Sequence, residues 1–115
     1  GDVYKRQTQR GIVHGFTVVS GHLPPGHEKS LVDWAALARS GATLAVIMGV
    51  RNAPSIATAL IDASLSPSTP CAIIQEGTLS TERAYHCTLD TLARTMTEQE
   101  ISSPAVYVIG EVAGL

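Results

Sequence analysis

Three short apolar segments of this chain each lead into a glycine, and this pattern limits the fold more than any other feature. The segments are Leu44–Met48 before Gly49, Cys71–Gln75 before Glu76 and Gly77, and Ala105–Ile109 before Gly110. Each is rich in branched or aliphatic residues, as buried strands are, and a helix-like segment separates each one from the next. This alternation predicts an α/β domain with a largely parallel sheet.

The N-terminal third contains signals for one further strand and one helix. Phe16–Ser20 is β-branched and aromatic, which favours a strand. Ser30 and Asp33 have the spacing of a capping box with the shorter acid, so we expect a helix to begin there. Gly41 is placed to close this helix in the left-handed conformation. The apolar face of the helix is expected to consist of Leu31, Trp34, Leu37 and Ala38.

The C-terminal two thirds repeat the alternation. A second helix is expected to begin at Asn52 or Ala53, because Pro54 is tolerated in a first turn. Arg83–Cys87 could be a short strand or the start of a helix. We favour a strand, with Thr88 as the N-cap of the helix that follows. The whole pattern predicts about five strands in a mainly parallel or mixed sheet flanked by helices.

The glycines indicate where a ligand would bind. In open α/β sheets, ligands lie in the crevice outside the carboxyl ends of the strands. A glycine there allows the backbone to approach a ligand and to turn sharply. Gly49, Gly77 and Gly110 therefore predict one binding edge, although each of them could also be an ordinary turn glycine.

Composition and charge exclude several classes of function. A chain of 115 residues corresponds to one domain, and its net charge of -2 with dispersed basic residues argues against nucleic-acid binding. No apolar stretch approaches the roughly 20 residues that a membrane span needs. Cys71 and Cys87 form no CxxC motif, which favours two small buried thiols in a reducing cytosol.

No catalytic or metal-binding motif can be identified. The chain lacks a GxGxxG loop, a P-loop and a GxSxG nucleophile elbow. The spacing of His22 and His27 matches no standard set of metal ligands. We therefore predict neither a metal site nor a catalytic residue in this chain. Composition and spacing alone indicate an α/β domain that binds a small molecule at its glycine edge.

The order and the amino-acid identities of several short segments are more informative about function. The segments are Thr8–Gly11, Phe16–His22, Val32–Trp34, Met48–Asn52, Thr69–Pro70, Glu76–Thr78 and Val108–Val112. Together they resemble the C-terminal half of the tetrapyrrole methylase family, in particular its members that methylate uroporphyrinogen III. The resemblance runs from about Thr8 to Leu115. The Thr-His-Arg that is common in the family reads Thr8-Gln9-Arg10 here, so no role is assigned to that histidine.

The resemblance implies a fold, a cofactor and partners. Family members transfer methyl groups from S-adenosylmethionine to ring carbons of a tetrapyrrole, and this branch converts uroporphyrinogen III to precorrin-2 for sirohaem and cobalamin. They are cytoplasmic homodimers of two-lobed subunits, with the methyl donor in the cleft between the lobes. In the family, the methionine of the Met-Gly turn and the glycine of the Glu-Gly-Thr turn contact the donor. These positions are Met48 and Gly77 in this chain.

The same resemblance defines the expected domain organisation. Residues 1–7 carry no pattern that joins them to the rest of the chain and are expected to be a non-native tail. Residues 8–115 are expected to form the C-terminal lobe. The N-terminal lobe, which contains the Gly-rich donor loop and the groups that handle protons, is then missing, and the chain is expected to be inactive alone. The alternative is a free-standing α/β module that binds a nucleotide or another metabolite at the same edge.

Overall fold

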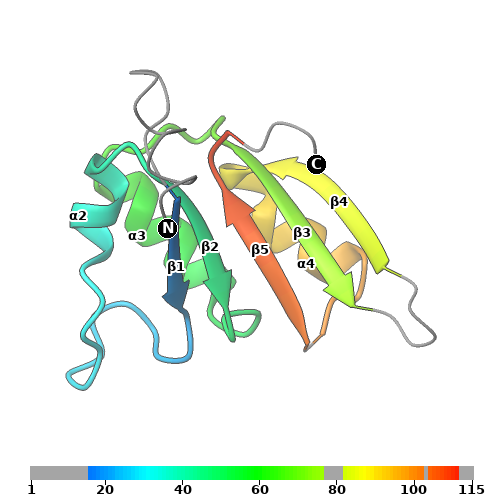
Figure 1. Cartoon of the computed structure of the whole chain (residues 1–115), viewed down its shortest axis with the longest axis horizontal. Helices are drawn as coiled ribbons and strands as arrows, with labels where there is room; N and C mark the ends of the chain where they lie inside the picture. Colours follow the sequence, from blue (N-terminus) through cyan, green and yellow to red (C-terminus); the bar gives the residue numbers. More distant parts are fainter. Residues whose placement is uncertain (1–15, 77–81, 103, 112–115) are drawn as a thin grey trace, which may run out of the picture.

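The computed structural model describes residues 16–76, 82–102 and 104–111, which form a five-stranded sheet with helices packed against it (Figure 1). The strands are β1 (Phe16–Ser20), β2 (Thr43–Ile47), β3 (Pro70–Glu76), β4 (Glu82–Thr88) and β5 (Ala105–Ile109). The helices are α2 (Trp34–Arg39), α3 (Ala53–Asp62) and α4 (Leu92–Glu98), and a 3-10 turn, η2 (Leu89–Thr91), leads into α4. Predicted and observed strands agree closely, and Arg83–Cys87 lies within a strand as expected.

The sheet is mixed, which confirms one of the two predicted arrangements and not the largely parallel one. Its strand order is β1-β2-β5-β3-β4. β1 and β2 pair in parallel, whereas β5 is antiparallel to both of its neighbours, β2 and β3. β4 pairs with β3 as an antiparallel neighbour. Apolar periodicity shows that a segment is a buried strand, but it carries no information about the direction in which that strand inserts.

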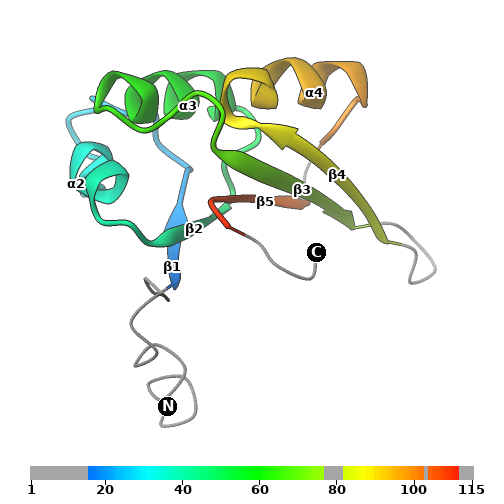
Figure 2. The same cartoon turned by 90° about the horizontal axis from the view of Figure 1, so that it is seen from above.

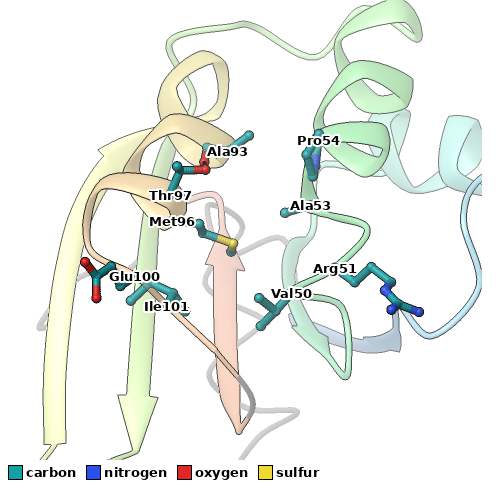
Figure 3. A pocket seen from close by; sticks show the side chains of 9 residues that line it. All are labelled: Val50, Arg51, Ala53, Pro54, Ala93, Met96, Thr97, Glu100 and Ile101. Atoms are coloured by element: carbon teal, nitrogen blue, oxygen red, sulfur yellow. Dashed lines mark hydrogen bonds between the residues drawn. The ribbon is translucent and has the colours of Figure 1, made fainter.

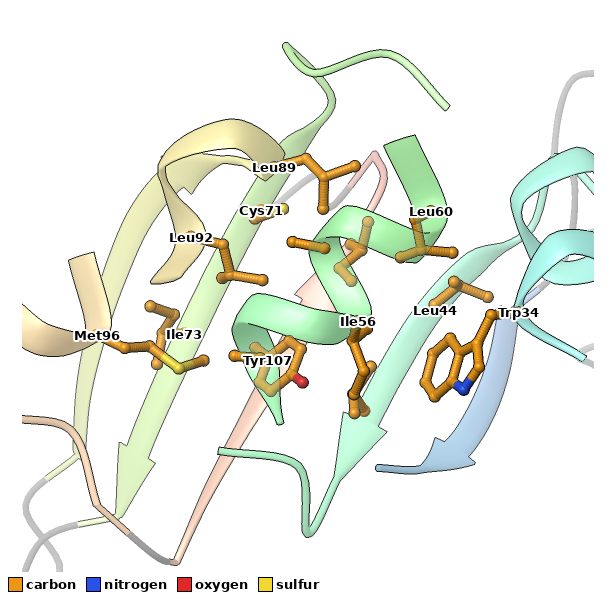
Figure 4. Packing of buried hydrophobic residues seen from close by; sticks show 14 of the residues in the cluster. Trp34, Leu44, Ile56, Leu60, Cys71, Ile73, Leu89, Leu92, Met96 and Tyr107 are labelled. Carbon is orange, nitrogen blue, oxygen red and sulfur yellow. The ribbon is translucent and has the colours of Figure 1, made fainter. Parts of the chain in front are cut away.

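The helices lie on one face of the sheet, and the hydrophobic core fills the layer between them (Figure 2). Its largest buried side chains come from β2, β3 and β5 below and from α3, η2 and α4 above (Figure 4). They include Leu44, Ile56, Leu60, Ile73, Leu89, Leu92, Tyr107 and Ile109, none of which is more than 1% exposed. Each such aliphatic side chain contributes about 1.5–3 kcal/mol through burial, so this layer is the main source of stability.

The opposite face of the sheet is different. Side chains alternate along a strand, so β1 directs Val19 toward the helices and Phe16 and Val18 away from them. Phe16 is 50% exposed and Val18 is 60% exposed. Single exposed apolar side chains are ordinary in proteins, but two on an edge strand leave an apolar surface at the β1 side of the molecule.

The first helix begins one turn later than the sequence predicts. Asp33, not Ser30, is the N-cap of α2, and its carboxylate Oδ1 accepts a hydrogen bond from the Ala36 N–H at 3.0 Å. Ser30 instead accepts a hydrogen bond from the Val32 N–H within a loop turn. Leu31 is consequently 98% exposed and lies outside the helix. Both residues are good caps, and only the path of the preceding loop decides between them.

The other predicted helix boundaries are confirmed. Asn52 is the N-cap position of α3, and Pro54 lies in the first turn. Thr88 forms a reciprocal capping box with Thr91 at the start of η2. Gly41 follows the C-cap of α2 with a φ of 78°, the left-handed conformation that glycine adopts without steric cost. The local signals were therefore sufficient wherever only one cap residue was available.

The assignment of the α2 cap can be tested by substitution. Asp33→Ala should lower the free energy of unfolding by about 1 kcal/mol, because it leaves the Ala36 N–H without its side-chain partner. Ser30→Ala is the matched control and should change it by less than about 0.5 kcal/mol. Urea denaturation followed by circular dichroism measures both values. A larger effect at Ser30 than at Asp33 would place the cap where the sequence first suggested.

Candidate functional site

One edge of the sheet collects the carboxyl ends of β1, β2 and β3. β2 and β3 run in the same direction because each is antiparallel to β5 between them, and β1 is parallel to β2. β5 ends at the opposite edge, where the Gly110 N–H donates to the Pro70 carbonyl at 2.8 Å. The expectation that Gly110 shares an edge with Gly49 is therefore wrong. Because β5 runs antiparallel to β2, Gly110 at its carboxyl end lies at the opposite edge from Gly49.

Met48 directly follows β2 at this edge and has an unusual conformation. Its φ is 54°, in the left-handed region that is unfavourable for a residue with a side chain. Its side chain is 60% exposed, so Met48 is not a core methionine that closes a strand. A flexible thioether is thus held outward at the carboxyl edge by a backbone turn that costs of order 1–2 kcal/mol.

The turn at Met48 rests on a close contact between two glycines. Gly21 follows β1, Gly49 follows Met48, and both are buried. A Cβ on Gly21 would lie 2.8 Å from the Gly49 Cα, and a Cβ on Gly49 would lie 2.7 Å from Val46 Cγ1. No side chain fits at either position. The ends of β1 and β2 therefore meet through backbone atoms alone.

Hydrogen bonds join these two strand ends into one rigid unit. The Gly21 N–H donates to the Ile47 carbonyl at 2.8 Å and extends the parallel ladder by one step. The Asn52 side-chain amide donates to the carbonyls of Gly21, at 2.7 Å, and His22, at 3.1 Å. The sequence predicts a capping position at Asn52 but no such bridge. The one sequence feature that could have indicated this bridge is the place of Asn52 in the Met48–Asn52 segment.

β5 adds a third anchor from the core. The Tyr107 hydroxyl donates to the Gly49 carbonyl at 2.9 Å, and the side chain is fully buried. Burial raises the pKa of this hydroxyl above its usual value, with a smaller effect from Cys71, so it stays a proton donor at neutral pH. The Gly49 carbonyl also accepts from the Asn52 N–H at 3.1 Å. Two donors on one carbonyl fix the orientation of the Gly49–Val50 peptide, directly after the turn at Met48.

The end of β3 lies at the same edge, on the other side of β5. Its Gln75 side chain donates to the Ser102 and Pro104 carbonyls and accepts from the Ser102 N–H, which holds the chain entering β5. Glu76 is the last described residue of β3, and Gly77 lies outside the described residues. The ends of β2 and β3 therefore open on the same edge, with β5 between them in the sheet.

A shallow cavity lies beside this edge on the helix side. It has a volume of about 280 Å³ and opens between the first turn of α3 and the last turn of α4 (Figure 3). Val50 and Met96 contribute apolar groups, and the Arg51 side chain extends away from Met96. The remaining lining residues are Ala53, Pro54, Ala93, Thr97, Glu100 and Ile101. The cavity therefore extends the Met48 edge with a wall of both apolar and polar groups.

Two histidines lie in the loop that follows β1. His22 is exposed, and the His27 Nδ1 accepts a hydrogen bond from the Lys29 N–H within its loop. In the part of the chain that the structure describes, no group of three or more His, Cys, Asp or Glu side chains could hold a metal ion. The helices among these residues are all too short or too polar to cross a membrane. The arrangement can bind and position a ligand.

The sequence and the fold of this chain correspond to a known class of protein. The family model of Tetrapyrrole (Corrin/Porphyrin) Methylases matches residues 5–93. Because this match covers most of the chain, the protein belongs to the tetrapyrrole methylase family. The cobalt precorrin-4 methyltransferase shares the fold, with a TM-score of 0.70 at 18% sequence identity over 82% of this chain and 39% of the other.

More similar proteins lie within one branch of the family. Uroporphyrinogen-III C-methyltransferase of Pseudomonas aeruginosa is 40% identical over 91% of this chain and 42% of its own length. Siroheme synthase of Hydrogenovibrio crunogenus is 38% identical over 91% of this chain and 22% of its own. Uroporphyrin-III C-methyl transferase of Thermus thermophilus, complexed with S-adenyl homocysteine, has a TM-score of 0.68 and 32% identity, covering 89% and 44% of the two chains. The chain thus spans less than half the length of these relatives.

The contact between the two glycines yields a stability prediction. Gly49→Ala should lower the free energy of unfolding by about 2–4 kcal/mol, since its Cβ would collide with Val46 and displace the Tyr107 hydroxyl. Gly26→Ala is the control, because Gly26 has a φ of 87° but open space around it. It should cost only about 1 kcal/mol, through strain alone. Equal losses in urea denaturation would mean that the contact is not tight.

Proposed function

We propose that this chain is the C-terminal lobe of an S-adenosylmethionine-dependent methyltransferase that converts uroporphyrinogen III to precorrin-2, on the route to sirohaem and cobalamin. Residues 8–115 form that lobe, and an N-terminal lobe completes the enzyme. Met48 and Gly77 contact the methyl donor. The enzyme acts as a cytoplasmic homodimer, and this lobe alone is inactive. Family membership and the similarity to named uroporphyrinogen-III C-methyltransferases support the choice of substrate.

The conformation of Met48 is the observation that supports this function best. Backbone strain persists only where the surrounding structure enforces it, and such strain is concentrated at binding and catalytic sites. Here Gly21, Gly49, Asn52 and Tyr107 hold the turn, and the result is an exposed thioether at a strand end. Core packing gives no reason for it, because the side chain is 60% exposed.

The chemistry of the edge fits an adenosyl group. A methionine side chain is flexible and polarisable, so it can pack against the face of a flat heteroaromatic ring. The rigid turn beneath it presents backbone groups at a strand end, where polar edges of a base can be bonded. At Gly77 the absence of a side chain leaves room for the backbone to approach the nucleoside.

The part of this lobe in the reaction is binding and positioning. The donor supplies an electrophilic methyl group, which a nucleophilic ring carbon of the tetrapyrrole can accept. The turn at Met48 orients the donor, and the apolar wall formed by Val50 and Met96 limits the access of water beside it. We assign no proton transfer to this chain.

The donor site can be tested in an enzyme that contains both lobes. Met48→Ala should weaken S-adenosylhomocysteine binding about five-fold, because it removes one thioether contact worth about 1 kcal/mol. Met48→Gly should weaken binding at least as much, yet raise the free energy of unfolding by about 1 kcal/mol by relieving the positive φ. Isothermal titration calorimetry and urea denaturation provide the two measurements.

Leu31→Ala is the matched control, because Leu31 is also an exposed apolar residue, 98% exposed, and lies in the loop before α2 and not in the turn at Met48. It should leave the affinity unchanged. Unchanged affinity in both Met48 variants would exclude Met48 from the donor site. Tight binding of a nucleotide by the 115-residue chain without an N-terminal lobe would instead favour the free-standing binding module.

A further inference from the structure

Cys71 and Cys87 lie directly opposite each other across the β3–β4 ladder. Directly opposed residues of antiparallel strands have Cα atoms about 4.5 or 5.5 Å apart, and both values lie within the range that a disulfide spans. Their side chains lie on the helix side of the sheet, close enough for each thiol to shift the pKa of the other. Neither forms a disulfide in this structure. The fold therefore brings together two thiols that the sequence presents as unrelated.

We propose that Cys71 and Cys87 form a redox-active pair, which a small peroxide converts into a disulfide across β3 and β4. Cys87 is the reacting thiol, and Cys71 is the resolving thiol. This modification site lies near the end of the hairpin where β4 runs into η2. It is separate from the donor-binding edge, which lies at the other end of β3. Its formation does not depend on methyl-donor binding.

The surroundings of the two sulfur atoms indicate which cysteine reacts first with the oxidant. Cys87 is partly exposed on the edge strand, so a small oxidant can reach it, whereas Cys71 is buried. The hydrogen bond from Cys71 lowers the pKa of Cys87 to about 7, aided by the Thr95 and Thr91 hydroxyls and opposed by burial. This shift increases the fraction of Cys87 that is the nucleophilic thiolate at neutral pH.

Cys71 is held as the neutral partner. Its hydrogen bond to Cys87, burial, and the negative charges of Cys87 and Asp90 all raise its pKa. Its thiol proton also has the Thr69 carbonyl as an acceptor, at 3.6 Å. Two of these effects disappear when Cys87 is no longer an anion, so oxidation of Cys87 itself makes Cys71 more reactive.

The chemistry balances with hydrogen peroxide as the oxidant. The Cys87 thiolate attacks one peroxide oxygen, the O–O bond breaks, and the leaving hydroxide takes up a proton to form water. Cys87 is then a sulfenic acid. The Cys71 sulfur attacks the Cys87 sulfur, the S–S bond forms as the S–O bond breaks, and the departing hydroxide leaves as water with the Cys71 proton. Two thiols and one peroxide give one disulfide and two waters.

Mass spectrometry of the 115-residue chain tests the proposal. The reduced chain is treated with one equivalent of hydrogen peroxide, alkylated, and digested with trypsin without reductant. Arg83 lies between the two cysteines, so cleavage there separates residues 52–83 from residues 84–94. We expect a disulfide to join these two peptides in the monomer and dithiothreitol to separate them. The disulfide should form at least ten-fold faster in the folded chain than in urea.

Two variants separate the roles. Cys71→Ala should leave Cys87 at the sulfenic acid stage, which dimedone traps, and Cys87→Ser should leave Cys71 unmodified. Any one of three results with the wild-type chain would overturn the proposal. These are disulfides only between two chains, over-oxidised Cys87 beside free Cys71, or a disulfide that forms equally fast in urea. The donor-binding site is not involved in any of these measurements, so their failure leaves the proposed methyltransferase function unaffected.

Discussion

The contact between the Gly21 and Gly49 backbones is the constraint on which the candidate site depends. It brings the end of β1 against the end of β2 with no side chain between them. The Gly21 N–H, the Asn52 amide and the Tyr107 hydroxyl then bind the carbonyls that this approach makes available. Because those partners come from three different elements, the turn between them cannot relax, and Met48 remains in a conformation that methionine rarely adopts.

The two methionines of the chain show how strongly position decides function. Met96 is 6% exposed and packs in the core from α4, while Met48 is 60% exposed at a strand end. Both have the same flexible thioether. One fills an irregular space between a helix and a sheet, and the other is available to a ligand. Hydrophobic composition does not distinguish these uses, and the backbone conformation does.

β3 connects the two chemical features of the molecule. Its carboxyl end lies at the candidate binding edge, where Gln75 holds the chain entering β5, and its amino end contains Cys71 opposite Cys87. β3 lies next to an edge strand, so a thiol on β4 remains within reach of small solutes while its partner is buried. A sheet of this order can therefore keep a binding edge and a redox-sensitive pair on one hairpin without direct contact between them.

The sequence by itself determined the elements and many of their boundaries. Local propensity and capping act over a few residues, and they were sufficient to predict several elements. These are the strand Phe16–Ser20, the helix start at Asn52, the cap at Thr88 and the strand before Gly110. Tertiary structure decided what involves distant segments. The antiparallel insertion of β5 moved Gly110 away from the binding edge, the loop path selected Asp33 over Ser30, and strand register paired Cys71 with Cys87. No local pattern encodes these outcomes, because each depends on which distant segment lies alongside and in which direction it runs.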